Sequence, residues 1–291
     1  MLTKTITINA HNPLHYRTVV GFNFDKVTNQ QYWDKRILHY YEEIMKTPIH
    51  ESLFGLRVNV NELNHFMLKL TVKEINLDEI HKFYSNSLNI VNVISFYYEH
   101  NEKVYHYEGF EYMNIYINGV ETPITPNSFV QANHEMGNIL YENMNEIVKP
   151  NDKVIIYGRN SFHIASQINT KFKNILCINP CKIAYNAGIQ MMIRNNYQWD
   201  AICSKEVLVN HINGCDNNTT IIMSPGRNGY AYFDQINFDK FKDKQVLYIT
   251  CNEETMNRDI KNNFNIKTNI MIELFPGTQY NEHIIELEFN F

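Results

Sequence analysis

Beyond residue 123 the chain alternates short apolar runs with stretches of helical periodicity, and this alternation constrains the fold more than any other feature. The apolar runs occupy residues 154–157, 174–178, 220–223 and 246–249. Strands that alternate with helices pair in parallel and carry helices on both faces of the sheet. We therefore predict an α/β, Rossmann-like fold with a mostly parallel, doubly wound sheet. Two last runs, at 270–275 and 283–289, lack a helix between them and are predicted to form a hairpin that closes the sheet edge.

The first part of the chain has a mixed pattern instead. Residues 65–72 alternate as a strand does, whereas 32–45 and 77–87 show helical periodicity. This mixture predicts a smaller α+β domain. Pro123 and Pro126 lie among turn residues and mark the boundary, so we expect one domain over 1–122 and a second over 123–291.

Composition narrows the class of protein. The 291 residues are 44% hydrophobic, which suffices for a substantial core. The formal net charge of -5 gives no overall positive potential that would indicate a nucleic-acid partner. A local basic groove remains compatible with that charge. We see neither a signal peptide nor an apolar run long enough to cross a bilayer, so we expect an intracellular, cytoplasmic protein without a membrane partner.

The cysteines indicate reduced thiols rather than a disulfide framework. There are five of them, an odd number, and several lie in or beside apolar segments. Cys177 and Cys181 have a spacing that suggests metal, but the second pair needed for four ligands is missing nearby. We predict no metal site.

Cys251 has the most informative position of the five. It follows a short apolar strand and precedes a helix start whose first turn carries carboxylates. Open α/β sheets place their chemistry at such strand ends, so the thiol is a candidate nucleophile. The alternative is a small buried hydrophobic residue, which is the usual role of a lone cysteine at a strand end.

Four local patterns, taken together, resemble the RNA uracil-5 methyltransferase family. Ser128-Phe129-Val130-Gln131-Ala132-Asn133 is similar to the family's Ser-Phe-x-Gln-x-Asn segment, and Ser224-Pro225-Gly226-Arg227-Asn228-Gly229 is similar to its Asp-Pro-x-Arg-x-Gly loop. Thr250-Cys251-Asn252 resembles the Ser-Cys-Asn nucleophile motif. Phe275-Pro276-Gly277-Thr278, followed by Glu282, resembles Phe-Pro-x-Thr followed by the catalytic Glu. The order and spacing of the patterns agree across residues 125–291.

The resemblance implies a class I methyltransferase domain that transfers a methyl group from S-adenosyl-L-methionine to C5 of a uracil in transfer or ribosomal RNA. It makes Cys251 the thiol that adds to C6 of the base and Glu282 the base that removes the C5 proton. The uracil would have to be flipped out of its stack, and DNA is not an expected partner. The cofactor-binding residues implied are Gln131, Tyr157, Gly158, Ser161, Asn179 and Ser224.

The chain departs from the family pattern at the cofactor residues. The turn after the first strand of the second domain has one glycine, Gly158, where the family commonly has two. Asn179 replaces the family's ribose-binding Glu, and Ser224 replaces the Asp of Asp-Pro-x-Arg. These changes leave an alternative open, in which the chain is a weak or inactive relative that acts as an RNA-binding or assembly protein.

The first domain also departs from bacterial relatives, since it has no small RNA-binding β-barrel and no iron-sulfur cysteines. RNA would then be held by residues 1–122. The candidate side chains are aromatic ones for stacking on bases and basic ones for phosphates, namely Tyr16, Phe22, Tyr97, Tyr98, Tyr105, Tyr107, Arg17, Arg57, Lys69 and Lys73. The alternative is that each aromatic fills the core of the α+β domain.

Overall fold

In the computed structural model, which describes residues 4–260, 263–278 and 280–290, the chain divides into two compact units. The large unit comprises the described residues of Met1–His11, Ile117–Thr122 and Glu135–Phe291. The small unit comprises Asn12–Tyr116 and Pro123–His134. Around the predicted boundary at residue 123, residues 117–122 therefore belong to the large unit and residues 123–134 to the small one. The chain crosses between them in a hairpin of β7 (Met113–Ile117) and β8 (Val120–Ile124).

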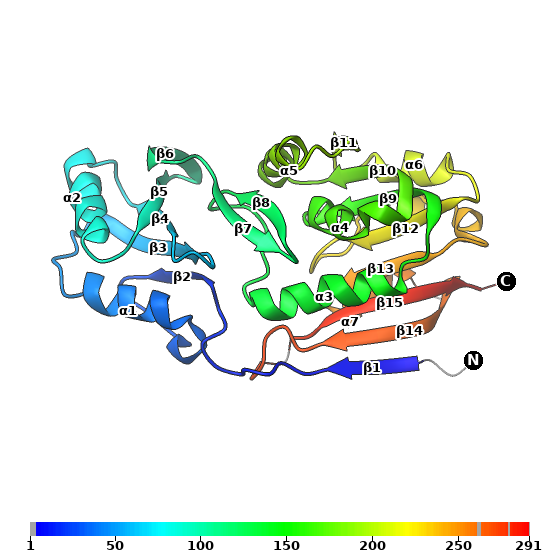
Figure 1. Cartoon of the computed structure of the whole chain (residues 1–291), viewed down its shortest axis with the longest axis horizontal. Coiled ribbons are helices and arrows are strands. Elements are labelled where there is room, and N and C mark those ends of the chain that lie inside the picture. Colours follow the sequence, from blue (N-terminus) through cyan, green and yellow to red (C-terminus); the bar gives the residue numbers. More distant parts are fainter. Residues whose placement is uncertain (1–3, 261–262, 279, 291) are drawn as a thin grey trace. The chain divides into compact units, whose positions relative to one another are not determined.

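The large unit is built on an eight-stranded sheet with the order β1-β14-β15-β13-β12-β9-β10-β11 (Figure 1). The four predicted apolar runs all form strands of it. β15 runs antiparallel to both of its neighbours, and the other pairings are parallel. The strands are β1 (Lys4–Ile8), β9 (Asn151–Gly158), β10 (Phe172–Asn179), β11 (Asp200–Cys203), β12 (Thr219–Ser224), β13 (Val246–Thr250), β14 (Phe264–Ile272) and β15 (Glu282–Phe289).

The predicted hairpin exists, but it does not close the sheet edge. β14 and β15 pair as expected, and β1 then pairs in parallel with β14 on its outer side, with Lys4 opposite Thr268 and Ile8 opposite Ile272. The prediction was wrong because β1 is short, largely exposed and far from its partner in sequence, so nothing local marks it as a strand of this sheet.

Helices cover both faces of this sheet, as a doubly wound fold requires. One face packs its strand residues against α6 (Leu208–Asn213) and α7 (Glu253–Ile260), in a cluster that contains Tyr157, Tyr230 and Tyr248. The other face carries α3 (His134–Ile147), α4 (Ser161–Ile168) and α5 (Lys182–Arg194), which lie in front of the strands in Figure 1. The apolar runs are buried on both sides, which explains why they lack alternation.

The small unit is an α+β module. Its five-stranded sheet has the order β2-β3-β4-β5-β6, with β4 and β5 parallel and the other pairs antiparallel. Two helices pack on one face around a core that includes Trp33, Tyr40 and Phe96. The elements are β2 (Val19–Asn23), α1 (Lys35–Ile44), β3 (Leu53–Val60), β4 (Phe66–Val72), α2 (Leu77–Leu88), β5 (Val93–His100) and β6 (Lys103–Gly109).

Candidate active site

A pocket of about 530 Å³ opens where β13 ends, and Cys251 lies in its wall. Thr250, the last residue of β13, pairs with His283 of β15, so the end of β13 lies beside the start of β15. The polar and charged side chains around the pocket come from three segments of the large unit, and Met271 of β14 adds an apolar one. The lining residues are Arg227, Cys251, Asn252, Glu253, Glu254, Met271, Tyr280, Asn281 and His283. Gln279, which lies between the Phe275–Thr278 motif and Glu282, is outside the described residues.

The Cys251 thiol is partly buried and is influenced by two charged neighbours. Burial raises its pKa, and the nearby Glu282 carboxylate raises it further, whereas the Arg227 guanidinium lowers it. At neutral pH the thiol is therefore mainly protonated. Arg227 is the neighbouring cation that favours the thiolate, which is the reactive form.

Glu282 is the first residue of β15, one position before His283. Burial raises the pKa of this carboxyl to about 7, and Arg227 acts in the opposite direction. Near neutral pH the group is therefore present both as the acid and as the carboxylate. A carboxyl poised in this way is suited to accepting a proton during a reaction. Cys251, Glu282 and Arg227 thus form one electrostatic neighbourhood.

Arg227 was not among the residues predicted for the site. It belongs to the loop after β12, which follows Ser224 at the carboxyl end of the strand. Its guanidinium lies 5.2 Å from the centre of the Tyr280 ring, a cation–π distance. The signal in the sequence was its place in the Ser-Pro-Gly-Arg pattern, but only the fold brings the side chain to Cys251.

His283 adds a polar side chain to the pocket wall. Its Nδ1 lies 3.1 Å from Asn269 Oδ1 and its Nε2 lies 3.4 Å from Glu253 Oε1. Burial lowers the pKa of this imidazole, and Glu253 raises it in part. Together with Asn252 and Asn281, His283 gives the pocket side chains that can donate and accept hydrogen bonds.

A second part of the site lies at the carboxyl ends of β9 and β12. Gly158, the last residue of β9, has φ +144° and pairs with Ser224, the last residue of β12. A Cβ atom at position 158 would lie 2.3 Å from the Ser224 carbonyl oxygen and 3.0 Å from Asn160 Oδ1. Only glycine fits there, so this close approach of the two strand ends depends on it.

Two buried polar atoms near this turn have no hydrogen-bonding neighbour among the described residues other than each other. They are Asn160 Oδ1, after β9, and the Tyr141 hydroxyl on α3. Burial raises the pKa of the Tyr141 phenol, the Asn160 side chain lowers it and the Glu282 carboxylate raises it, so the three side chains are neighbours. Buried polar groups are normally paired. An acceptor and a hydroxyl that have only each other as neighbours, beside Glu282, leave room for further hydrogen bonds to a polar ligand at this place.

Asn179 is committed to bonds within the protein. Its Nδ2 donates to the Arg159 carbonyl at 3.1 Å and to Ser161 Oγ at 3.4 Å, and its Oδ1 accepts from the Cys181 amide at 3.0 Å. The residue is fully buried at the end of β10. In this arrangement its amide fixes the turn after β9 and is not presented to a ribose.

The other predicted cofactor residues differ in their surroundings. Gly158 and Ser224 pair at the carboxyl ends of β9 and β12, and Asn179, the last residue of β10, bonds to Ser161 at the start of α4. The Tyr157 side chain instead packs in the core, 4.8 Å from the Tyr230 ring. Gln131 is buried in the small unit, ahead of α3.

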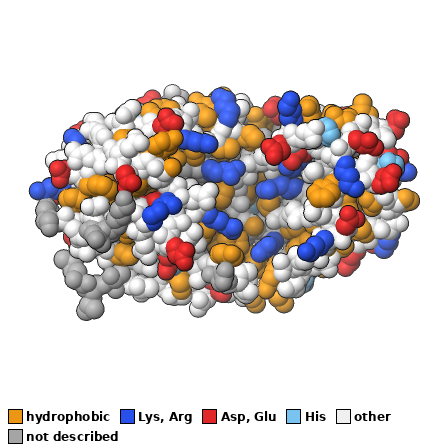
Figure 2. All heavy atoms as spheres, turned by 180° about the vertical axis from the view of Figure 1, so that it is seen from behind, with side chains coloured by type: hydrophobic (Ala, Val, Ile, Leu, Met, Phe, Trp, Pro, Cys, Tyr) orange, Lys and Arg blue, Asp and Glu red, His pale blue; other side chains and the backbone are white. Residues whose placement is uncertain are grey.

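Several aromatic and basic candidates for RNA contact are engaged inside the small unit. Phe22 belongs to its hydrophobic core, and Lys69 pairs with Glu99. Tyr105 and Lys73, in contrast, are exposed. Figure 2 shows Lys and Arg side chains interspersed with Asp and Glu on the face that it draws, so positive charge does not cover that face uniformly.

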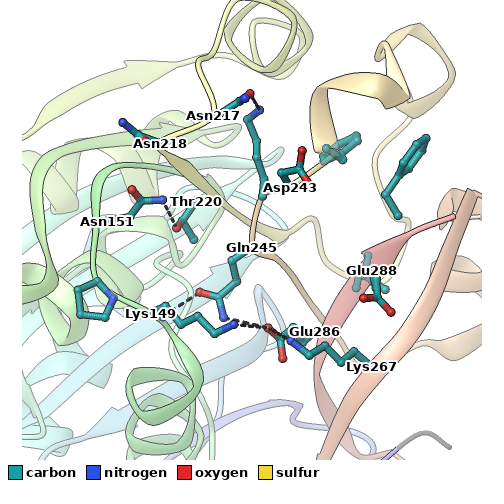
Figure 3. Close-up of a pocket in the computed structure, with 15 residues that line it drawn as sticks. Lys149, Asn151, Asn217, Asn218, Thr220, Asp243, Gln245, Lys267, Glu286 and Glu288 are labelled. Carbon is teal, nitrogen blue, oxygen red and sulfur yellow. Dashed lines mark hydrogen bonds and ion pairs between the residues drawn. The ribbon is translucent and has the colours of Figure 1, made fainter. Parts of the chain in front are cut away.

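A second pocket, of about 470 Å³, lies at the opposite end of the strands from Cys251, where β9, β12 and β13 begin (Figure 3). Lys149 and Lys267 approach Glu286 of β15 from two sides, with Nζ–Oε1 distances of 3.8 and 3.3 Å. Gln245 Nε2 also donates to Glu286 Oε1, at 3.2 Å. The buried carboxylate thus faces two lysines and accepts a hydrogen bond from Gln245, and the network ties these segments together at this end of the sheet.

Two further observations concern metals and membranes. Within the described ranges, no three His, Cys, Asp or Glu side chains gather in a way that could hold a metal ion. None of the described helices is both long enough and apolar enough to cross a membrane.

Comparison with known sequences gives two relatives. No family model matches the chain. It is 28% identical over 193 residues to an uncharacterized RNA methyltransferase of Nanoarchaeum equitans, and 28% identical over 244 residues to one of Fusobacterium nucleatum. The alignments cover 63% and 80% of this chain but 41% and 51% of those proteins. The chain therefore spans about half the length of the curated relatives it matches.

Comparison with solved structures concerns the fold. Pyrococcus abyssi tRNA (uracil-54, C5)-methyltransferase, solved with S-adenosyl-L-homocysteine, matches with a TM-score of 0.76 and 18% identity, over 98% of this chain and 79% of that one. M. jannaschii tRNA m1G37 methyltransferase matches with a TM-score of 0.52 and 11% identity, over 91% and 82%. The first match confirms the predicted α/β, Rossmann-like fold, which this chain shares with methyltransferases of known structure.

Proposed function

We propose that this chain is an S-adenosyl-L-methionine-dependent RNA methyltransferase that methylates C5 of a uracil in a structured RNA, either tRNA-like or ribosomal. The observation that carries the proposal is the neighbourhood of Cys251, Glu282 and Arg227 at a pocket beside the carboxyl ends of β12 and β13. A thiol, a carboxyl group with a pKa near 7 and a cation are the groups that this reaction needs. The names of the two sequence relatives support an RNA substrate.

Cys251 would act as the nucleophile. C5 of uracil attacks a methyl group poorly until a thiolate adds to C6, because the addition leaves an enolate whose negative charge is shared by C5 and O4. A new S–C6 bond forms and the C5–C6 double bond is lost. Arg227 would favour the thiolate that starts this step, since it lowers the pKa of the thiol against the effects of burial and Glu282.

Glu282 would complete the cycle as the base. After C5 has been methylated, its proton moves to the Glu282 carboxylate, the C5–C6 double bond re-forms and the S–C6 bond breaks. The thiolate of Cys251 is thereby released and the product is 5-methyluracil. A carboxyl with a pKa of about 7 can take up this proton and return it to water near neutral pH.

The residues at the ends of β9 and β12 fit a bound methyl donor. S-adenosyl-L-methionine supplies the methyl group when it is bound. Gly158 would let it approach the backbone, while the buried polar atoms of Asn160 and Tyr141 would bind its polar groups. Ser224 ends β12 and Ser161 begins α4 after β9, and Gln131 remains a predicted contact. Because Asn179 is used internally, we do not assign the ribose to it in this arrangement.

The RNA would present its uracil unstacked, since neither face of C5–C6 is open within a stack. The exposed Tyr105 and Lys73 of the small unit are the candidates for stacking on a base and for contacting a phosphate. The alternative of an inactive RNA-binding or assembly relative is not favoured, because such a protein has no need for a thiol and a titratable carboxyl held together.

The test uses unmodified transcripts of tRNAs and ribosomal RNA fragments with labelled methyl donor. We expect 5-methyluridine in the digested RNA, detected by mass spectrometry, and none with Cys251→Ala. RNA that contains 5-fluorouracil should form a denaturation-resistant adduct with the wild type, since fluorine cannot leave as the C5 proton does. Tight RNA binding and donor binding without any adduct or product, across both RNA classes, would reject the proposal in favour of the inactive relative.

A further inference from the structure

Asp259 is a buried carboxylate that the proposed chemistry does not use. It lies on α7 and is 3% exposed. Its Oδ2 accepts hydrogen bonds from the Tyr230 amide at 2.8 Å and from the Tyr248 hydroxyl at 2.6 Å. Its Oδ1 accepts from Arg258, at 2.6 Å from Nη2 and 3.1 Å from Nε. A buried charge persists only when it is satisfied in this way, so the position is strongly specified.

These bonds fasten α7 to the loop that carries Arg227. The loop runs from Pro225 to Gly229 between β12 and Tyr230. Gly229 has φ +67°, and a Cβ atom there would lie 2.4 Å from Asp259 Oδ2. The loop backbone is therefore packed directly on the carboxylate, and the glycine is what allows this approach.

Three more hydrogen bonds hold the loop by two of its carbonyl groups. The Arg227 carbonyl accepts from Thr255 Oγ1 at 2.9 Å and from Asn252 Nδ2 at 3.3 Å, and the Asn228 carbonyl accepts from Arg258 Nη2 at 2.8 Å. All three donors belong to α7 or to the residue that precedes it. We name these contacts, with those of Asp259, the α7 bracket.

We propose that the α7 bracket positions Arg227 against Cys251, and that Asp259 and Thr255 are positioning residues for the thiol. This inference rests on the proposed function, in which the thiol is the nucleophile. An arginine side chain has many rotamers, and fixing its backbone from three sides limits where the guanidinium can reach. The same helix begins at Glu253, two residues after Cys251, so one element sets both the thiol and its cation.

The test measures the thiol itself, without RNA or methyl donor. Iodoacetamide alkylation of the Cys251 peptide is followed by mass spectrometry as a function of pH, with the exposed Cys203 as an internal reference. Thr255→Val removes the hydroxyl and keeps the size of the side chain. We expect the alkylation midpoint to move up by about 0.5–1 pH unit, because the guanidinium is held less closely to the thiolate. Asp259→Asn should shift it in the same direction.

The controls separate positioning from general damage. Thr255→Ser keeps the hydroxyl and should restore the wild-type midpoint, and Asp239→Asn makes the same chemical change at an exposed site of the large unit. In an Arg227→Gln background, Thr255→Val should add no further shift, since the group that it positions is gone. Thr255→Val also covers the case in which Asp259→Asn fails to fold.

Two outcomes would overturn the inference. Folded Thr255→Val protein with an unchanged midpoint, while Arg227→Gln shifts it, would mean that Arg227 acts without the bracket. An unchanged midpoint in Arg227→Gln itself would mean that the guanidinium does not act on the thiol. Absence of uracil methylation in the wild type is a separate result, because the thiol titration is read without any substrate.

Discussion

Replacing Glu282 with Gln should change the stability of the protein in a way that depends on pH. Burial raises the pKa of this carboxyl from 4.5 to about 7, with Arg227 opposing the rise. The folded protein therefore holds the proton more tightly than the unfolded chain does. The stability that this proton provides is fully present below pH 4.5 and is lost as the pH rises through about 7.

The size of the effect follows from the two pKa values. A change from 4.5 to about 7 corresponds to about 3.4 kcal/mol at 25 °C. The Glu282 side chain is only partly buried, so water screens part of its charge. We therefore expect the loss of stability to be about 1–3 kcal/mol. Gln carries no charge, so Glu282→Gln removes this penalty at alkaline pH. The variant should be more stable than the wild type at pH 8 by that amount.

Urea unfolding at pH 5 and pH 8 gives the free energy of unfolding of both proteins. The stability difference between the variant and the wild type should grow from pH 5 to pH 8, whereas Glu142→Gln, at an exposed position of α3, should show no such growth. A difference that stays constant between the two pH values would refute the reasoning. A Gln variant that is the less stable protein at pH 8 would refute its sign.

Three further predictions concern the same end of the sheet. Gly158→Ala should destabilise the protein by about 2–4 kcal/mol in thermal or urea unfolding. The added Cβ would overlap the Ser224 carbonyl, and residue 158 has a φ of +144°, which alanine rarely adopts. Unchanged stability would contradict the close approach of the two strand ends. Asn179→Asp should lower the free energy of unfolding by about 1–3 kcal/mol, because a carboxylate oxygen would face the Arg159 carbonyl where the amide now donates a hydrogen bond. Calorimetry should show that S-adenosyl-L-methionine binds this variant no more tightly than the wild type. A variant that is more stable or binds the cofactor more tightly would argue against the internal role of Asn179. The rate at which 5-methyluridine is formed and released should rise with pH through a midpoint near 7 as Glu282 ionises, and a rate that falls over that range would exclude it as the base.

Strong local patterns predicted the central strands. The runs at 154–157, 174–178, 220–223 and 246–249 became β9, β10, β12 and β13, because a strand buried on both faces is apolar throughout and is bounded by turns. β11 and β1 carry no comparable signal. Each is short and mostly not buried, and it belongs to the sheet through pairing with a strand already in place.

Sequence patterns also predicted Cys251 as the nucleophile and Glu282 as the base, but they did not predict the side chains around these two residues. Tyr141 and Asn160 are separated by a strand, and their meeting depends on how α3 packs against the sheet. Asn179 has a residue type that could bind a ribose. Which partners its amide takes is decided by the path of the turn after β9, and no spacing in the sequence records that path.

The pairing of β1 with β14 has a consequence for how the large unit is assembled during synthesis. Lys4 and its partner Thr268 are separated by most of the chain, so β1 emerges from the ribosome long before the strand that receives it exists. Closing so long a loop is slow, and until then β14 would leave a row of unpaired backbone groups along the outside of the sheet. The nascent chain therefore has to keep β1 uncommitted until β14 exists, and its docking replaces the longer exposed edge of β14 with the shorter edge of β1.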